Sequence, residues 1–123
     1  MSASCDVFIV EDDYDIREVL TFVLEGEGYS VDGAENGSVA LEALRCGSRP
    51  KLILLDLMMP VMSGPQFAAE KKKEAGLTSI PVVVLSADID VEQKAATLGA
   101  EASLRKPVDV DSLLAMVKSF CCP

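Results

Sequence analysis

Residues 52–56 read Leu-Ile-Leu-Leu-Asp, four consecutive apolar side chains followed by a carboxylate. A strand with one face in solvent alternates apolar and polar residues, so this run predicts a strand that is buried on both faces. Such strands are typical of parallel sheets with helices on both sides. Open sheets of this class bind ligands beyond the carboxyl ends of their strands. Asp56 is therefore the first candidate for a site residue.

Strand and helix patterns alternate along the rest of the chain. Further strands are predicted near residues 7–10, 29–31, 81–85 and 102–105, and each strand precedes apolar residues at helical spacing. Five such units predict an α/β fold of the flavodoxin-like, doubly wound (βα)5 type. Its five-stranded parallel sheet is expected in the order 2-1-3-4-5, with the poorly apolar second strand at an edge. No linker divides the sequence, so residues 1–123 are predicted to form a single domain.

Composition narrows the classes of function. The chain carries a net charge of −9 and no histidine, which disfavours direct nucleic-acid binding and excludes histidine bases and metal ligands. The N-terminus lacks the basic segment of a secretory leader, and the apolar runs are too short to cross a membrane. These features predict a cytoplasmic protein with no membrane partner. The four cysteines are then expected to be free thiols.

Polar residues follow four of the predicted strands. The first strand ends in Glu11-Asp12-Asp13, the third in Asp56, the fourth in Ser86 and the fifth in Lys106. Parallel strands end at the same edge of a sheet, so these side chains are expected to share one cleft. Clustered carboxylates repel one another unless a cation lies among them, and an all-oxygen set of ligands favours Mg²⁺.

This set of side chains suits phosphoryl transfer to a carboxylate. An aspartate is already ionised at neutral pH, and a metal together with Lys106 can neutralise the transferred group. Each residue alone has a simpler interpretation: the acidic residues at 11–13 as helix caps, Asp56 as a turn residue, and Lys106 as a surface lysine. Their occurrence together at successive strand ends favours the phosphoryl site.

At these residues the sequence resembles the receiver domains of two-component response regulators. The resemblance runs from about Asp6 to Phe120. The segments that carry it are Phe8-Ile9-Val10-Glu11-Asp12-Asp13 with Ile16-Arg17, Leu54-Leu55-Asp56-Leu57-Met58-Met59-Pro60 with Gly64, Val84-Leu85-Ser86-Ala87, Leu98-Gly99-Ala100 and Lys106-Pro107.

The resemblance implies a Mg²⁺ site. Asp12 and Asp56 would be direct ligands, and Glu11 would act mostly through water. Met58 would contribute its backbone carbonyl. Asp13 would lie outside the ligand shell and start a helix.

The resemblance also implies how the phosphoryl group is held. Asp56 would be the phospho-acceptor, Ser86 would move to bond the phosphoryl group, and Lys106 would pair with it. The Lys106–Pro107 peptide bond would be cis.

The implied function is that of a signalling switch in a two-component system or phosphorelay. The domain would not be an enzyme, beyond assisting its own phosphoryl transfer and dephosphorylation. A sensor histidine kinase or a histidine phosphotransfer protein would supply the phosphoryl group. Because the chain ends after the fifth helix, a separate downstream protein effector is expected to read the signal.

Two departures from the family pattern affect the predicted output. Ser103 stands three residues before Lys106, where the family usually has an aromatic residue. The segment from Ser86 to Lys106 is also slightly short. Both changes predict an atypical output face beside an intact acceptor site.

Alternative functions remain open from the sequence. The chain could be a pseudo-receiver that acts as a constitutive protein-interaction module. An aspartyl phosphatase or phosphotransferase is disfavoured by Met58, which stands where such enzymes often have a second acid. A flavin module is disfavoured because no glycine-rich phosphate loop follows the first strand.

Three further segments have structural interpretations. The run Lys71–Lys73 is predicted to be a solvated helix face. Val91, Ala95 and Leu98 are predicted to face the core. Met58, Met59 and Met62 either form a docking patch or anchor their loop against the core.

Overall fold

The computed structural model describes residues 6–57 and 62–121. The elements, in chain order, are β1 (Val7–Val10), α1 (Tyr14–Gly26), β2 (Val31–Ala34), α2 (Gly37–Arg45), β3 (Leu52–Asp56), α3 (Gly64–Lys72), β4 (Val82–Ser86), α4 (Val91–Leu98), β5 (Ala102–Arg105) and α5 (Val110–Cys121). None of the helices in these two ranges has the length and apolar character needed to cross a membrane.

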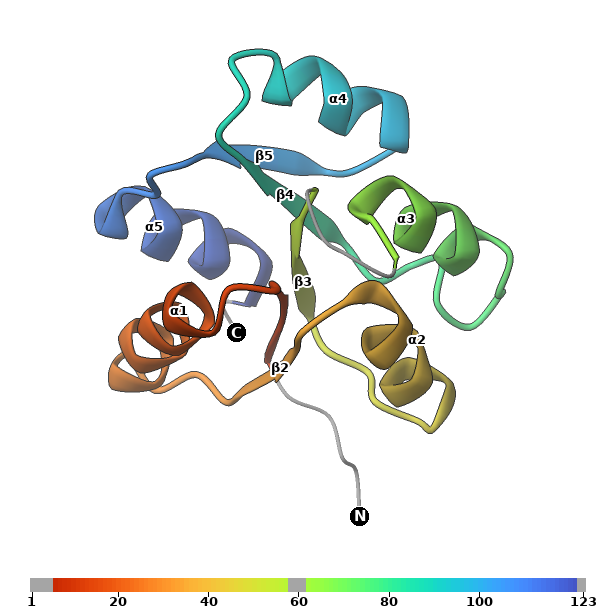
Figure 1. The fold of residues 1–123 in the computed structure, drawn as a ribbon. Helices are drawn as coiled ribbons and strands as arrows, with labels where there is room; N and C mark the ends of the chain where they lie inside the picture. The colour runs from red at the N-terminus through yellow and green to blue at the C-terminus, as the bar shows by residue number, and fades with distance from the viewer. Residues whose placement is uncertain (1–5, 58–61, 122–123) are drawn as a thin grey trace.

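The five strands form one parallel sheet in the order β2-β1-β3-β4-β5 (Figure 1). This is the predicted flavodoxin-like order, with β2 at an edge. Strand β2 starts at Val31, two residues later than predicted, because the backbone of residue 30 instead bonds to Asp6. Strands β3 and β4 are buried at every position, as expected for central strands covered on both faces.

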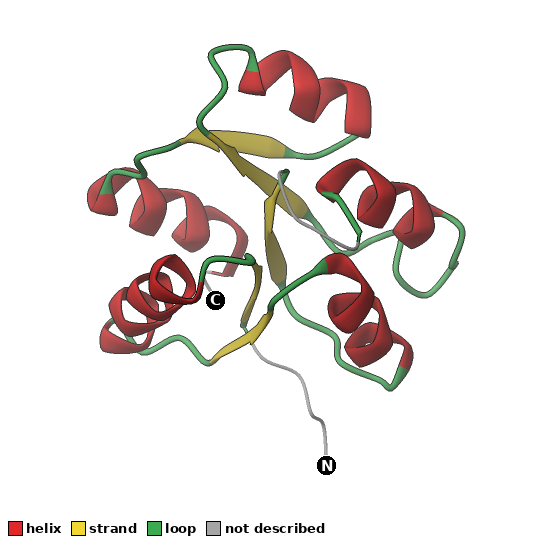
Figure 2. Ribbon diagram, viewed as in Figure 1, coloured by secondary structure: helices red, strands yellow, loops and turns green. Residues whose placement is uncertain are grey.

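Helices cover both faces of the sheet (Figures 1 and 2). Alternate residues of each strand point to opposite faces, so neighbours such as Ile53 and Leu54 belong to different cores. One core packs α2, α3 and α4 against the sheet, and the other packs α1 and α5. The sheet is therefore enclosed, and its polar residues collect at the strand ends.

Side-chain caps start several of the helices. Asp13 accepts a hydrogen bond from the Ile16 amide at α1, which matches the predicted helix-start role. Asn36 caps α2, and Ser63 forms a capping box with Gln66 at α3. Helix α4 ends at Gly99, which has a φ of 77°.

Two packing predictions concern helix α4 and the methionines before α3. Val91 and Ala95 are buried and Leu98 is partly buried against the core, as predicted. Met62 packs against the same core, which fits the loop-anchoring interpretation, whereas Met58 and Met59 lie outside the described residues.

The prediction of a solvated face at Lys71–Lys73 was wrong for one residue. Lys71 is buried, whereas its two successors are exposed, because position 71 of α3 faces the sheet together with Phe67. Val110, an apolar residue at the start of α5, is 48% exposed. Cys46 and Cys121 are free thiols, and Cys5 and Cys122 lie outside the described residues.

Candidate functional site

The carboxyl ends of β1, β3, β4 and β5 meet at one cleft. Glu11 follows β1, Asp56 and Ser86 end β3 and β4, and Lys106 follows β5. The cleft has a volume of about 260 Å³. It is lined by Glu11, Asp12, Asp13, Ile16, Asp56, Ser86, Ala87 and Lys106. The structure thus brings together every predicted site residue except Met58, which lies outside the described residues.

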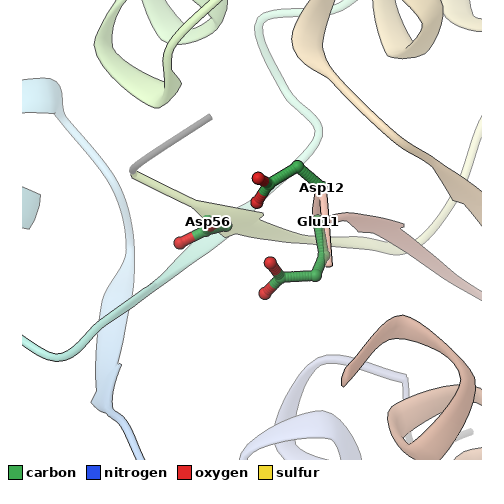
Figure 3. A group of neighbouring side chains, drawn as sticks. All are labelled: Glu11, Asp12 and Asp56. Carbon is green, nitrogen blue, oxygen red and sulfur yellow. The ribbon is translucent and has the colours of Figure 1, made fainter. Parts of the chain in front are cut away.

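Three carboxylates converge in this cleft (Figure 3). Each of Glu11, Asp12 and Asp56 places an oxygen within 4.8 Å of the others. Glu11 and Asp56 are buried, at 1% and 4% exposure, and Asp12 lies open to solvent. The donors are all hard carboxylate oxygens, and one member is accessible, so this cluster fits a Mg²⁺ ion that keeps part of its water shell.

Lys106 supplies the positive charge of the cleft. Its Nζ lies 2.8 Å from Glu11 Oε1 and 3.2 Å from Asp56 Oδ1. Burial lowers the pKa of this ammonium, but its hydrogen bonds to the two carboxylates and their charges outweigh burial and raise the pKa overall. Lys106 is therefore a permanent cation that bridges β1 and β3.

Lys106 does not neutralise the carboxylates completely. Burial, together with the nearby charge of Asp56, raises the pKa of Glu11 to about 7, against the opposing hydrogen bonds from Lys106 and the Asp13 amide. By geometry, the cluster sets three carboxylates against this one lysine, and like charges at such distances repel one another. A divalent cation would relieve that excess, which is a second reason why these residues fit Mg²⁺.

Ser86 also lines the cleft and is 2% exposed. Its Oγ accepts a hydrogen bond from the Asp88 amide at 3.1 Å, and its carbonyl accepts one from the Lys106 amide at 2.8 Å. The Lys106–Pro107 peptide bond is cis, as the resemblance implies. The hydrogen bond from the Lys106 amide therefore ties the residue that follows β5 to the last residue of β4.

Three supporting contacts were missed by sequence reasoning. Arg17 Nη1 donates to the Glu11 carbonyl at 2.6 Å. Gly64 packs so closely that an added Cβ would lie 2.8 Å from the Asp56 carbonyl oxygen. Lys94 of α4 pairs with the Asp88 carboxylate. Only the Gly64 contact had a local signal, a glycine shortly after the strand, because the others depend on how α1 and α4 dock.

An apolar groove adjoins the cleft along α1. It has a volume of about 490 Å³ and shares Ile16, Ala87 and Lys106 with the cleft. On the same helix, Val19 and Phe22 are 60% and 80% exposed. The acidic cleft therefore continues, at these shared residues, into an exposed apolar groove.

Residues 7–118 match the family description "Response regulator receiver domain". The chain belongs to this receiver family. Receiver domains are signalling modules of two-component systems and phosphorelays rather than conventional enzymes, and they interact with histidine kinases or phosphotransfer proteins. Mg²⁺-dependent phosphorylation of an aspartate is general for the family.

Two curated relatives illustrate the sequence similarity of this receiver domain. An uncharacterized 14.6 kDa protein of Leptolyngbya boryana is 35% identical over 97% of this chain and 92% of its own length. The transcriptional regulatory protein CpxR homolog of Haemophilus influenzae is 37% identical over 93% of this chain. The chain spans only 49% of that regulator.

Solved receiver structures share the fold. A putative response regulator of Chloroflexus aurantiacus aligns with a TM-score of 0.87 and 26% identity over 100% of both chains. The receiver domain of the sensor histidine kinase PA1611 of Pseudomonas aeruginosa also gives a TM-score of 0.87, at 22% identity, covering 98% of this chain and 100% of its own. That structure has a magnesium ion coordinated in its active-site cleft.

Proposed function

We propose that this receiver domain, taken as one domain over residues 1–123, is a signalling switch that accepts a phosphoryl group on Asp56 in a Mg²⁺-dependent reaction. The observation that carries the proposal is the setting of the Asp56 carboxylate. It is buried and paired with Lys106, and it lies beside two further carboxylates in an open cleft. A nucleophile with a cation on one side and a place for a metal on the other suits phosphoryl transfer.

The metal is proposed to bind between β1 and β3. Asp12 and Asp56 would be direct carboxylate ligands, Glu11 would act through water, and Met58 would add its backbone carbonyl. Bound Mg²⁺ supplies positive charge that offsets the charge of the transferring phosphoryl group.

In the proposed transfer, an Asp56 carboxylate oxygen forms a bond to the donor phosphorus while the bond from phosphorus to the donor breaks. Lys106 holds the ammonium charge against the phosphoryl oxygens, and the Ser86 hydroxyl turns to donate a hydrogen bond to one of them. The domain assists the later hydrolysis of the acyl phosphate, in which water takes the phosphoryl group and the Asp56 carboxylate is restored.

The donor is proposed to be a sensor histidine kinase or a histidine phosphotransfer protein in the cytoplasm. The apolar groove along α1 supports a protein donor, because it lies open beside the acceptor cleft and shares Ile16 and Lys106 with it. A downstream protein effector would read the phosphorylated state.

The output is proposed to be atypical. Ser103 lies half-buried on β5, paired in register with Val84, so no aromatic ring is available there to follow the Ser86 hydroxyl. Helix α4 has eight residues, the fewest of any helix in the described ranges. The route from the site to the surface is instead expected to pass through the β4–α4 loop.

Intact mass after incubation with acetyl phosphate tests the proposed function. The wild-type chain should gain one phosphoryl group with Mg²⁺ and none without it. The Asp56→Asn variant should gain none under either condition. Asp32→Asn is the matched control, because Asp32 is an exposed aspartate on the edge strand β2, and its variant should behave like the wild type.

The second candidate is a pseudo-receiver that binds a partner constitutively, and the substitution at Ser103 favours it. Folded wild-type protein that gains no phosphoryl group with Mg²⁺ present would contradict the switch and support this candidate. The binding surface would then be sought around β5.

A further inference from the structure

Arg17 of α1 is hydrogen-bonded to the backbone that carries two of the acidic residues. Its Nη1 lies 2.6 Å from the Glu11 carbonyl oxygen. That carbonyl belongs to the peptide unit between Glu11 and Asp12, whose carboxylates both face the cleft (Figure 3). The orientation of this peptide plane therefore influences where both carboxylates point.

Two amides of the same turn are also hydrogen-bonded. The Glu11 amide donates to the Ala34 carbonyl of β2 at 3.0 Å. The Asp13 amide donates to Glu11 Oε2 at 3.2 Å. With Arg17 on the Glu11 carbonyl, the turn is held from β2, from α1 and by its own side chain.

The Arg17 side chain is itself confined. Its guanidinium carbon lies 5.5 Å from the centre of the Tyr14 ring, a distance suited to a cation–π contact. On its other side, a Cβ added to Gly33 of β2 would lie 3.0 Å from Arg17 Cδ and 3.4 Å from Cγ. The absence of a side chain at position 33 thus leaves room for the arginine stem.

We propose that Arg17 is a positioning residue for the divalent cation, which acts by fixing the Glu11–Asp12 peptide so that their carboxylates converge with Asp56. Arg17 does not touch the cation. This inference rests on the proposed function, because it concerns the same metal site. It adds two residues to the description of that site. Arg17 binds none of the reacting groups, and Gly33 leaves room for the Arg17 stem.

Two effects of Arg17 on the cation have opposite signs, which makes the proposal testable. A guanidinium that acted only through its charge would repel Mg²⁺, so its removal would tighten binding. A guanidinium that orders the ligands would favour Mg²⁺, so its removal would weaken binding. The direction of the change therefore separates positioning from simple charge.

The experiment is a calorimetric Mg²⁺ titration of the unphosphorylated full chain, with amide hydrogen exchange at Asp12 and Asp13 measured without metal. Arg17→Met keeps an apolar stem beside Gly33 and removes the guanidinium. We expect about a tenfold loss of Mg²⁺ affinity, typical of lost outer-sphere partners, and faster exchange at both amides. Arg45→Met is the control for loss of one positive charge, because Arg45 is an exposed arginine on α2 that pairs with Glu74.

A second variant tests the same contact by changing Gly33 on β2. Gly33→Ala leaves Arg17 in place but crowds its stem, so Mg²⁺ affinity should fall in the same direction. In the double variant, Gly33→Ala should add little to the loss caused by Arg17→Met, because both changes break one interaction. Arg17→Lys should restore part of the affinity.

The inference is overturned if folded Arg17→Met binds Mg²⁺ as tightly as the wild type, or more tightly. If Arg17→Met does not fold, unchanged affinity in Gly33→Ala overturns it equally. Wild-type protein that binds no Mg²⁺ would instead overturn the proposed function. The two failures are therefore distinguishable.

Discussion

At the scale of single residues, Lys71 is a buried lysine on α3. It is 6% exposed and borders a small pocket with Thr78 and Glu101. Burial lowers the pKa of its ammonium group, and the negative charge of Glu101 offsets only part of that effect. The charge of Glu101 therefore offsets only part of the cost of burying this ammonium group.

Replacing Lys71 with methionine should stabilise the protein. Methionine keeps a long flexible stem and removes the buried charge, so the free energy of unfolding at pH 7 should rise by about 1 kcal/mol. Urea denaturation measures the change. Lys73→Met is the control, because Lys73 is exposed and pairs with the half-buried Glu70, and its variant should change stability little.

The stabilisation by Lys71→Met should depend on pH in a defined direction. The folded-state pKa of Lys71 lies below its ordinary value of 10.5, so between these two pKa values the unfolded chain binds more protons than the folded chain. Wild-type stability therefore gains from Lys71 as pH rises through that window, and the advantage of the variant should shrink. An advantage that stayed constant up to pH 10.5 would contradict the assignment of a buried charge.

At the scale of elements, the start of α3 is packed directly onto the end of β3. A Cβ added to Gly64 would lie 2.8 Å from the Asp56 carbonyl oxygen and 2.8 Å from Leu57 Cα. Both atoms belong to the backbone, so they can move only if the strand end moves. Ser63 caps the same helix and holds its first turn in place.

Gly64→Ala should therefore destabilise the protein and disturb the acceptor. Overpacking of this kind costs about 2 kcal/mol in the free energy of unfolding. Phosphorylation of Asp56 by acetyl phosphate should also slow, because the carbonyl next to the acceptor shifts. Gly26→Ala is the control, since an added Cβ there meets nothing within 4 Å and should change neither quantity for the worse. Wild-type stability in Gly64→Ala would show that α3 can retreat freely from the strand.

At the scale of the whole molecule, the site is connected to α4 through one loop. The Ser86 hydroxyl accepts the Asp88 amide, and the Asp88 carboxylate pairs with Lys94 on α4. If Ser86 turns toward a phosphoryl group, the Asp88 amide loses its acceptor and the loop is loosened. Asp88 is therefore bonded through its amide to the site residue Ser86 and through its carboxylate to Lys94 of α4.

Hydrogen exchange on phosphorylation should locate this path. Amides from Asp88 to Lys94 should exchange faster in the phosphorylated wild type, whereas those around Ser103 should change little. Lys94→Met should raise exchange in the same loop without phosphorylation, because it removes the ion pair that holds Asp88. Lys118→Met, at an exposed position of α5, is the control. A large rearrangement around Ser103, with no change at Asp88, would contradict this route.

Local sequence patterns predict much of the fold. Several features depend only on neighbours in sequence: the buried runs at 52–55 and 82–85, the weaker run near Val31 and the cap at Asn36. The element order and the edge strand were therefore predictable. The candidate site was predictable too, because a parallel sheet brings the ends of its strands together wherever its helices lie.

The sequence by itself determined the sheet order and the convergence of Glu11, Asp56, Ser86 and Lys106 on one cleft. Only the tertiary structure decided the exposure of particular helix residues. Lys71 on α3 is buried, whereas Phe22 on α1 is exposed. It also decided the contacts of Arg17 with Glu11 and of Lys94 with Asp88. These contacts join separate elements or a loop to a helix, so they depend on distances that no local pattern encodes.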